Sequence, residues 1–147
     1  MNKIYKKINK TEIPEKYNLF LDDDENRIPQ KLSWCELPFV NWIIVRTHDE
    51  FIECVANHGL PVMVSFDHDL ADNHYQEYHR ANEGDKKLDY NNYKEKTGYH
   101  VAQWLAQYCI DNKLKLPVYF VHSMNYMGKQ NIISVMESAE KFIKSSN

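Results

Sequence analysis

The chain has 147 residues, close to the usual size of one domain, and combines 43% hydrophobic with 27% charged residues and only 4 glycines and 5 prolines. This composition excludes disordered and fibrous proteins, and no apolar run approaches the roughly 20 residues that span a membrane. The 18 Lys and Arg against 21 Asp and Glu give a net charge of −3, which excludes a chain-wide polyanion-binding surface. We expect one soluble domain over residues 1–147, with no membrane partner and only local nucleic-acid contact.

Three cysteines are spread along the chain at Cys35, Cys54 and Cys109, with no CxxC pair. An odd number at these spacings argues against a disulfide framework and against a structural zinc site. This usage is typical of a reducing compartment, so we expect a cytoplasmic protein. Cys54 and Cys109 fall within amphipathic patterns and are predicted to be small core residues.

The basic lead segment, residues 1–16, carries five lysines and lacks the apolar centre of a signal peptide. Two interpretations stay open. A solvated tail is the more usual one, and an arm that contacts nucleic acid is the sharper one.

In chain order, the first half predicts two strands and one helix. The apolar run at residues 17–21 is a strand that leads directly into the acidic residues 22–25. Residues 25–41 are irregular, with at most a helical turn over residues 30–37, and residues 42–46 form a second strand. Thr47 or Asp49 caps a helix that continues to about residue 58, where Gly59 and then Pro61 stop it.

The second half begins with a third strand at residues 61–66, which is followed by a polar insertion, residues 71–96, without a clear period. A helix over residues 97–112, a fourth strand over residues 116–121 and a last helix over residues 128–143 complete the chain.

The insertion leaves the third strand at the edge where we expect the site. Its tyrosines and basic residues suit base stacking and phosphate contact, as in single-strand binders. These residues are Tyr75, Tyr78, Arg80, Lys86, Lys87, Tyr90, Tyr93, Lys94 and Lys96. A lid over the site is the favoured interpretation, and a surface loop whose tyrosines pack on its own base is the alternative.

Strands that are apolar on both faces and alternate with helices are typical of a parallel sheet covered by helices. Because crossovers between parallel strands are right-handed, the sequence predicts a three-layer, doubly wound α/β fold with helices on both faces. In such folds the site lies at the carboxyl ends of the strands, near the point where the strand order reverses.

Acidic residues follow two of the predicted strands. Asp22 and Asp23 end the first strand, and Asp67 and Asp69 end the third. If these strands are neighbours, the carboxylates lie close together and favour a cation. Oxygen ligands without thiolates suit Mg²⁺ above all, with Mn²⁺ or Ca²⁺ as alternatives. Capping and loop solvation by aspartates is the competing explanation.

Histidine and small polar residues follow the remaining strand end. His122 ends the fourth strand. It is a candidate general acid or base, a candidate hydrogen-bond donor to phosphate, or a core histidine whose hydrogen bonds are made within the protein. After it come Ser123, Asn125, Gly128 and Lys129 at the start of the last helix. A hydroxyl, an amide, a glycine and a helix start together predict an anion-binding turn, although the P-loop pattern is absent.

Five segments carry a family resemblance: LDDDENRIP at residues 21–29, residues 42–47, SFDHDL at residues 65–70, TGYHVAQWL at residues 97–105 and HSMNYMGKQNI at residues 122–132. Together they resemble the divergent receiver (CheY-like) superfamily, and most closely its cyclic-phosphate processing receiver domains. The resemblance implies a receiver- or flavodoxin-like sheet of four strands in the order 2-1-3-4. The fifth strand of ordinary receivers, with its Lys-Pro ending, is missing, and their first helix is reduced to residues 25–41.

The resemblance also implies roles for individual residues. Asp22 and Asp23 match the acidic pair that holds Mg²⁺ in receivers, Asp67 matches the phosphoacceptor, and Asp69 is an addition typical of the clade. His122 or Ser123 stands where receivers place the hydroxyl that contacts the phosphoryl group. The other positions that match the clade are Arg27, Arg46, His68, Asn125 and Gly128.

Two functions follow from this comparison. The first is a metal-dependent phosphoesterase that acts on a cyclic phosphate, either a 2′,3′-cyclic RNA end or a cyclic nucleotide. Its expected metal ligands are Asp22, Asp23 and Asp67. Its expected catalytic residues are Asp67, His122, Asp69 and His68, and its expected phosphate-binding residues are Ser123, Asn125, Gly128, Lys129, Arg27 and Arg46. The second is a non-catalytic pseudoreceiver that binds a phosphorylated ligand or a partner protein.

Overall fold

The computed structural model describes residues 13–70, 77, 79–81, 87–92 and 96–146. Most of the basic lead segment and most of the insertion lie outside the described residues, and so do most of the nucleic-acid contacts and the lid that the sequence predicts there. The described elements are β1 (Asn18–Leu21), η3 (Pro29–Lys31), β2 (Ile43–Val45), α1 (His48–His58), β3 (Met63–Phe66), η4 (Tyr90–Asn92), α3 (Gly98–Asp111), β4 (Val118–Val121) and α4 (Tyr126–Ser145).

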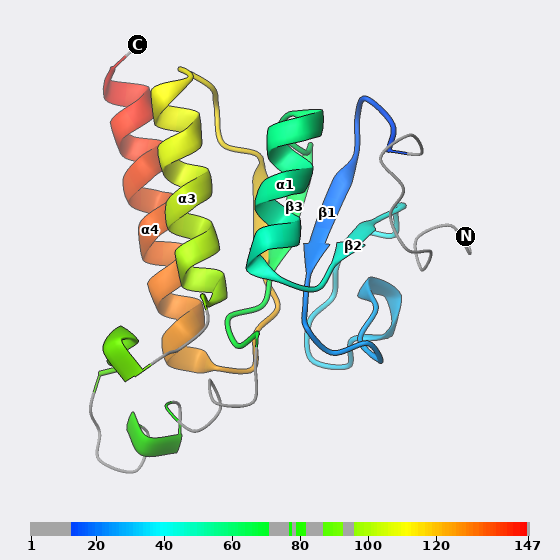
Figure 1. Ribbon diagram of the computed structural model, residues 1–147, viewed down its shortest axis with the longest axis vertical. Coiled ribbons are helices and arrows are strands. Elements are labelled where there is room, and N and C mark those ends of the chain that lie inside the picture. The colour runs from blue at the N-terminus through cyan, green and yellow to red at the C-terminus, as the bar shows by residue number, and fades with distance from the viewer. Residues whose placement is uncertain (1–12, 71–76, 78, 82–86, 93–95, 147) are drawn as a thin grey trace.

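The four strands form one parallel sheet in the order β2-β1-β3-β4, as the sequence predicts (Figure 1). Leu21 at the end of β1 pairs with Val45 on one side and with Phe66 on the other, and Phe66 pairs with Val121. The four strands therefore end level with one another. The residues that follow them meet at one edge of the sheet.

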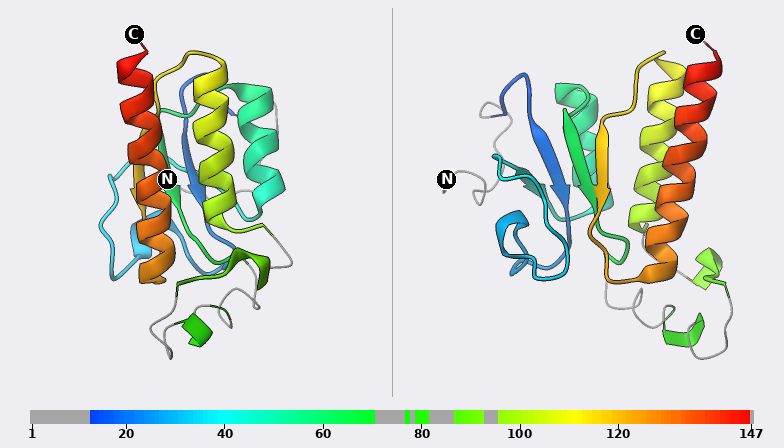
Figure 2. Two further views of the ribbon diagram at one scale, coloured as in Figure 1. Left: turned by 90° about the vertical axis from the view of Figure 1, so that its left-hand side faces the viewer. Right: turned by 180° about the vertical axis from the view of Figure 1, so that it is seen from behind.

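The hydrophobic core lies on one face of the sheet. Leu19 and Leu21 of β1 point to this face, and α1, α3 and α4 lie side by side over it (Figure 2). Helix side chains in this core include Phe51, Val55, Val101, Leu105, Ile132 and Met136, and the predicted core cysteines Cys54 and Cys109 are also buried here. The amphipathic stripes of the three helices thus supply a single packed layer.

The second face is covered differently from the expectation of α-helices on both faces. Phe20 points to this face, where its ring stacks on His122 with centroids 4.4 Å apart and meets Trp42 edge-on at 6.5 Å. The indole nitrogen of Trp34 donates to the carbonyl oxygen of His122. The third layer is therefore the segment of residues 22–42, whose only regular element is the three-residue η3, because the buried indole of Trp42 and the partly exposed indole of Trp34 take the place of a helix.

Helix boundaries follow from local capping. Thr47 caps α1 by accepting from the amide of Glu50, and Gly59 ends this helix at φ 85°, a conformation that glycine adopts without strain. Thr97 caps α3 within a capping box that includes His100. Asn125 caps α4, which begins two residues before the predicted start and ends at Ser145. No helix in the described part of the chain is long and apolar enough to cross a membrane.

Gly98 allows the start of α3 to lie against the end of β3. Its amide donates to the carbonyl of His68 over 2.8 Å, and a Cβ at this position would lie 1.7 Å from the carbonyl oxygen of Asp67. Backbone rather than a flexible side chain occupies that space. Only glycine fits here.

Gly98→Ala is therefore expected to lower the free energy of unfolding by about 1–3 kcal/mol, the usual cost of overpacking, in spite of the higher helix propensity of alanine. Urea unfolding measures this change. Ser138→Ala, on the exposed side of α4, is the control and is expected to stay within about 0.5 kcal/mol of wild type. Equal stabilities for the two variants would contradict the close contact.

Candidate active site

Two buried carboxylates meet at the carboxyl edge of the sheet. Asp22 follows β1 and Asp67 follows β3, and because these strands are paired neighbours, their side chains lie beside the ring of His122 from the end of β4. One ligating atom from each of the three residues lies within 4.8 Å of the others. All three side chains are buried, with residue exposures of 0%, 2% and 0% respectively. We call this group the acidic cluster.

Electrostatics make the acidic cluster unfavourable without a cation. Burial raises the pKa of Asp67 well above its usual range, and the charges of Asp22, Asp69 and Asp23 raise it further, against the lowering effect of Arg27. Its Oδ1 accepts from the amide of His68 over 2.8 Å, whereas its buried Oδ2 accepts no hydrogen bond from the described residues. Buried oxygens of this kind are normally satisfied, so the cluster can hold a metal ion.

Asp23 lies next to the acidic cluster but outside it. Its carboxyl group is half-buried, and one of its oxygens is buried without a hydrogen-bond partner among the described residues. Burial and the neighbouring charge of Asp22 raise the pKa of Asp23 to about 6. Of these two neighbouring acids, Asp22 is the more deeply buried.

Arg27 provides positive charge at the opening of the cluster. Its Nη1 lies 3.6 Å from Asp22 Oδ2 and 3.8 Å from Asp67 Oδ2, and its side chain is 21% exposed. The guanidinium also lies 5.2 Å from the ring centroid of Trp34 and 4.0 Å from the sulfur of Met124. Arg27 therefore neutralises part of the cluster and keeps contact with solvent.

Arg46 has a different environment. Its guanidinium donates to the backbone carbonyls of Asp22, Asp24, Glu25 and Arg27 over 2.7–3.4 Å. These bonds hold the turn after β1 in place. The described contacts of Arg46 are thus with the protein backbone, whereas the sequence predicts a phosphate contact for it.

His122 is fully buried and both of its ring nitrogens have partners. Nε2 lies 3.0 Å from Asp22 Oδ2 and Nδ1 lies 2.7 Å from Ser65 Oγ. Since a carboxylate only accepts, Nε2 donates to Asp22 and Nδ1 accepts from the serine hydroxyl. Burial lowers the pKa of His122, although Asp22 acts to raise it. In this arrangement the neutral imidazole orients Asp22.

His68 and Asp69 are also buried, but they face the start of α4. His68 Nδ1 lies 2.8 Å from Asp69 Oδ1, and Asn125 Nδ2 donates to both oxygens of Asp69 over 3.2–3.3 Å. Asn125 Oδ1 accepts from the amide of Gly128 over 2.9 Å. The sequence predicts phosphate contacts for Asn125 and Gly128, and the structure shows that they bind each other.

The remaining predicted phosphate-binding residues are at the same edge. Ser123 is buried, and its Oγ accepts from the amide of Asn125 over 3.1 Å. Lys129 is half-buried on the first turn of α4. We call residues 123–129 the α4 turn. It forms one side of the edge at which the acidic cluster lies (Figure 1).

Three functional contacts were not predicted from the sequence. Ser65 binds His122, Trp34 packs on Arg27, and the hydroxyl of Tyr90 lies 2.8 Å from His68 Nε2. Ser65 is the polar residue of an otherwise apolar strand, which is the signal that identifies it. Trp34 and Tyr90 stand in irregular segments without a period, so no pattern indicated where they pack.

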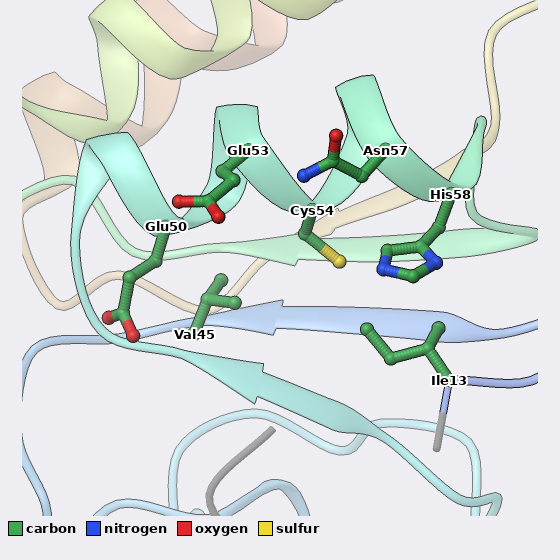
Figure 3. A pocket seen from close by; sticks show the side chains of 7 residues that line it. All are labelled: Ile13, Val45, Glu50, Glu53, Cys54, Asn57 and His58. Atoms are coloured by element: carbon green, nitrogen blue, oxygen red, sulfur yellow. The ribbon is translucent and has the colours of Figure 1, made fainter. Parts of the chain in front are cut away.

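A separate small pocket lies away from the acidic cluster, between α1 and the sheet (Figure 3). Glu50, Glu53, Asn57 and His58 of α1 line it together with Cys54, Val45 and Ile13. Glu50 accepts from the amide of Arg46, so part of its carboxylate serves the end of β2. No strand-end acid reaches this pocket, and we assign the site to the acidic cluster.

The sheet order, the acidic pair after β1 and the buried aspartate after β3 define a receiver-like α/β domain. Residues 17–138 match the family described as the cyclic-phosphate processing receiver domain, and the chain belongs to this family. Comparisons with curated proteins and with solved structures gave no match. The family links the site to a phosphate-containing substrate.

Asp67→Asn is expected to stabilise the metal-free protein at neutral pH. Folding raises the pKa of Asp67, so the contribution of this group to the wild-type free energy of unfolding is fully present below the ordinary pKa of 3.8 and is lost as the pH rises through the raised value. Each pKa unit removed is equivalent to about 1.4 kcal/mol. Urea unfolding in the presence of a chelator, over roughly pH 4–8, measures the difference. Parallel pH profiles for the two proteins would contradict the buried charge.

Proposed function

We propose that this domain is a metal-dependent phosphoesterase that opens a cyclic phosphate. The observation that carries the proposal is the buried Oδ2 of Asp67, which has no hydrogen-bond partner among the described residues and faces both Asp22 and the guanidinium of Arg27. A buried carboxylate in this condition costs folding free energy, and a ligand that brings a cation and a phosphate removes that cost.

We assign the protein to the cytoplasm because its three cysteines are free.

The metal that suits these ligands is Mg²⁺, with Mn²⁺ or Ca²⁺ as alternatives. Asp22 and Asp67 would hold it, and Asp23 is the next carboxylate available. A hard divalent ion of this kind polarises phosphoryl oxygens and neutralises negative charge that develops on them.

Three side chains bind the phosphate of the substrate. Arg27, which lies between the acidic cluster and solvent, donates to a non-bridging phosphate oxygen. Ser123 and Lys129 contribute a hydroxyl and a positive charge from the α4 turn. Asp67 orients the attacking water. The water oxygen bonds to phosphorus, one ester bond of the ring breaks, and the leaving oxygen gains a proton from that water.

The organic part of the substrate has a suitable surface beside Arg27. Trp34 is 39% exposed and Met124 is 61% exposed, and both contact the arginine. An exposed indole next to a phosphate site stacks well on a nucleobase. This supports a 2′,3′-cyclic RNA end or a cyclic nucleotide as the substrate.

His122 is assigned a positioning role through Asp22, in place of the proton donor that the sequence predicts. Its ring is fully buried and both nitrogens are bonded. His122→Asn is therefore expected to weaken Mg²⁺ binding and turnover together, each by about tenfold or more. Titration calorimetry and initial rates measure the two effects. Loss of turnover with unchanged Mg²⁺ affinity would restore His122 as the acid.

A pseudoreceiver that binds a phosphorylated ligand or partner without turnover is the second candidate. The full burial of His68 and His122 favours it, because neither ring is exposed to a substrate. The same cluster of carboxylates and Arg27 serves binding in this case. The two candidates differ in whether product forms.

The test is a screen of 2′,3′-cyclic and 3′,5′-cyclic nucleotides for hydrolysis with Mg²⁺, Mn²⁺ or Ca²⁺. Asp67→Asn is expected to lower turnover by at least about 10²-fold, because the group that orients water is lost. Asp49→Asn, a control whose side chain is 97% exposed on α1, is expected to keep wild-type rates. Tight ligand binding without product in the wild type would establish the pseudoreceiver instead.

A further inference from the structure

A chain of side-chain hydrogen bonds connects η4 to the start of α4. The Tyr90 hydroxyl lies 2.8 Å from His68 Nε2 and accepts from Asn131 Nδ2 over 3.1 Å. From His68 the chain continues to Asp69 over 2.8 Å and then to Asn125, whose other amide atom caps α4 at Gly128. It joins the described end of the insertion to the α4 turn.

The proton positions in this chain are fixed by its end groups. The carboxylate of Asp69 only accepts, so His68 Nδ1 donates to it, and His68 Nε2 accepts from the hydroxyl of Tyr90. Asn131 donates to the same phenolic oxygen. Each hydrogen bond in the chain therefore has a fixed donor and a fixed acceptor. Removal of the Tyr90 hydroxyl takes this donor away from His68 Nε2.

The arrangement of carboxylate, imidazole and hydroxyl resembles that of an activated nucleophile. Burial raises the pKa of Tyr90 above its usual range, which disfavours the phenolate. The Tyr90 ring is also stacked on Tyr99 with centroids 4.3 Å apart. Tyr90 therefore keeps its proton, and its hydroxyl acts as a fixed hydrogen-bond donor to His68.

The ring of His68 is pressed against α4 where Gly128 leaves room for it. A Cβ on Gly128 would lie 2.3 Å from His68 Cγ, and His68 itself has no exposed surface. A rotation of the His68 ring would therefore displace Gly128, Asn125 or both. The bond from Tyr90 prevents that rotation by fixing the far side of the ring.

We propose that Tyr90 is a positioning residue for the α4 turn, acting through His68, Asp69 and Asn125. The proposal rests on the proposed function in one respect, since Ser123 and Lys129 of that turn are assigned to the phosphate. It makes η4 a part of the site, because Tyr90 is its first residue. Tyr90 itself does not touch the substrate.

Tyr90→Phe tests the proposal in the full chain by removing one oxygen atom. Amide hydrogen exchange followed by NMR is expected to be about tenfold faster at Gly128 and unchanged at Leu105 in the middle of α3. Tyr108→Phe, near the C-terminal end of α3, is the control, and we expect it to leave the exchange rate of the Gly128 amide unchanged. Asn131→Ala, which removes only the second partner of the phenol, is expected to give a smaller effect at the same amide.

Unchanged exchange at Gly128 in Tyr90→Phe would overturn the proposal, and so would an equal acceleration at Gly128 and Leu105, which indicates general loss of stability. Titration with inorganic phosphate in the presence of Mg²⁺ supplies a second readout, expected to be weakened severalfold by Tyr90→Phe and not by Tyr108→Phe. If the wild type binds no phosphate, the proposed function fails at that step, whereas the exchange experiment still decides whether Tyr90 positions the turn.

Discussion

The repulsion between Asp22 and Asp67 is the interaction on which the rest of the structure depends. The two strands that carry them are paired in register, so both carboxylates arrive at the same buried place without freedom to separate. Like charges in such a place are unfavourable unless a cation or a proton joins them. Keeping this pair together lowers the free energy of unfolding, and such a cost is typical of a ligand-binding site.

Neighbouring residues reduce this cost only in part. Arg27 lies beyond 3.5 Å from both carboxylates, and of these two carboxylates His122 bonds only to that of Asp22. Arg46 donates to the backbone carbonyls of Asp22 and Arg27 and so holds the turn after β1, but its charge has no described contact with either carboxylate. Among the described residues, Asp67 is left with one oxygen that has no hydrogen-bond partner. One oxygen of the neighbouring Asp23 is in the same condition, and unsatisfied acceptors of this kind are what a ligand-binding site offers.

The sheet order and the acidic residues could be predicted because buried parallel strands are continuous apolar runs and their ends share one edge. The covering of the second face could not, since residues 22–42 have no period and depend on where Trp34 and Trp42 pack. The roles of His68 and His122 were out of reach for the same reason. A sequence places a histidine at a strand end, but its two ring nitrogens are assigned only by partners such as Ser65, which come from elsewhere in the chain.

The two aspartates of the DHDL segment show how ligand-facing and protein-facing acids can be told apart. Asp67 and Asp69 are equally buried, and the sequence predicts both as catalytic residues, with Asp67 alone also predicted as a metal ligand. Asp69 accepts from both His68 and Asn125, so its charge is already compensated by groups that a ligand would have to displace. Asp67 keeps an oxygen near Asp22 that accepts no hydrogen bond from the part of the chain that the structure describes. Because the cost of displacing satisfied bonds opposes binding, the ligand belongs to Asp67, and Asp69 serves to hold the wall beside it.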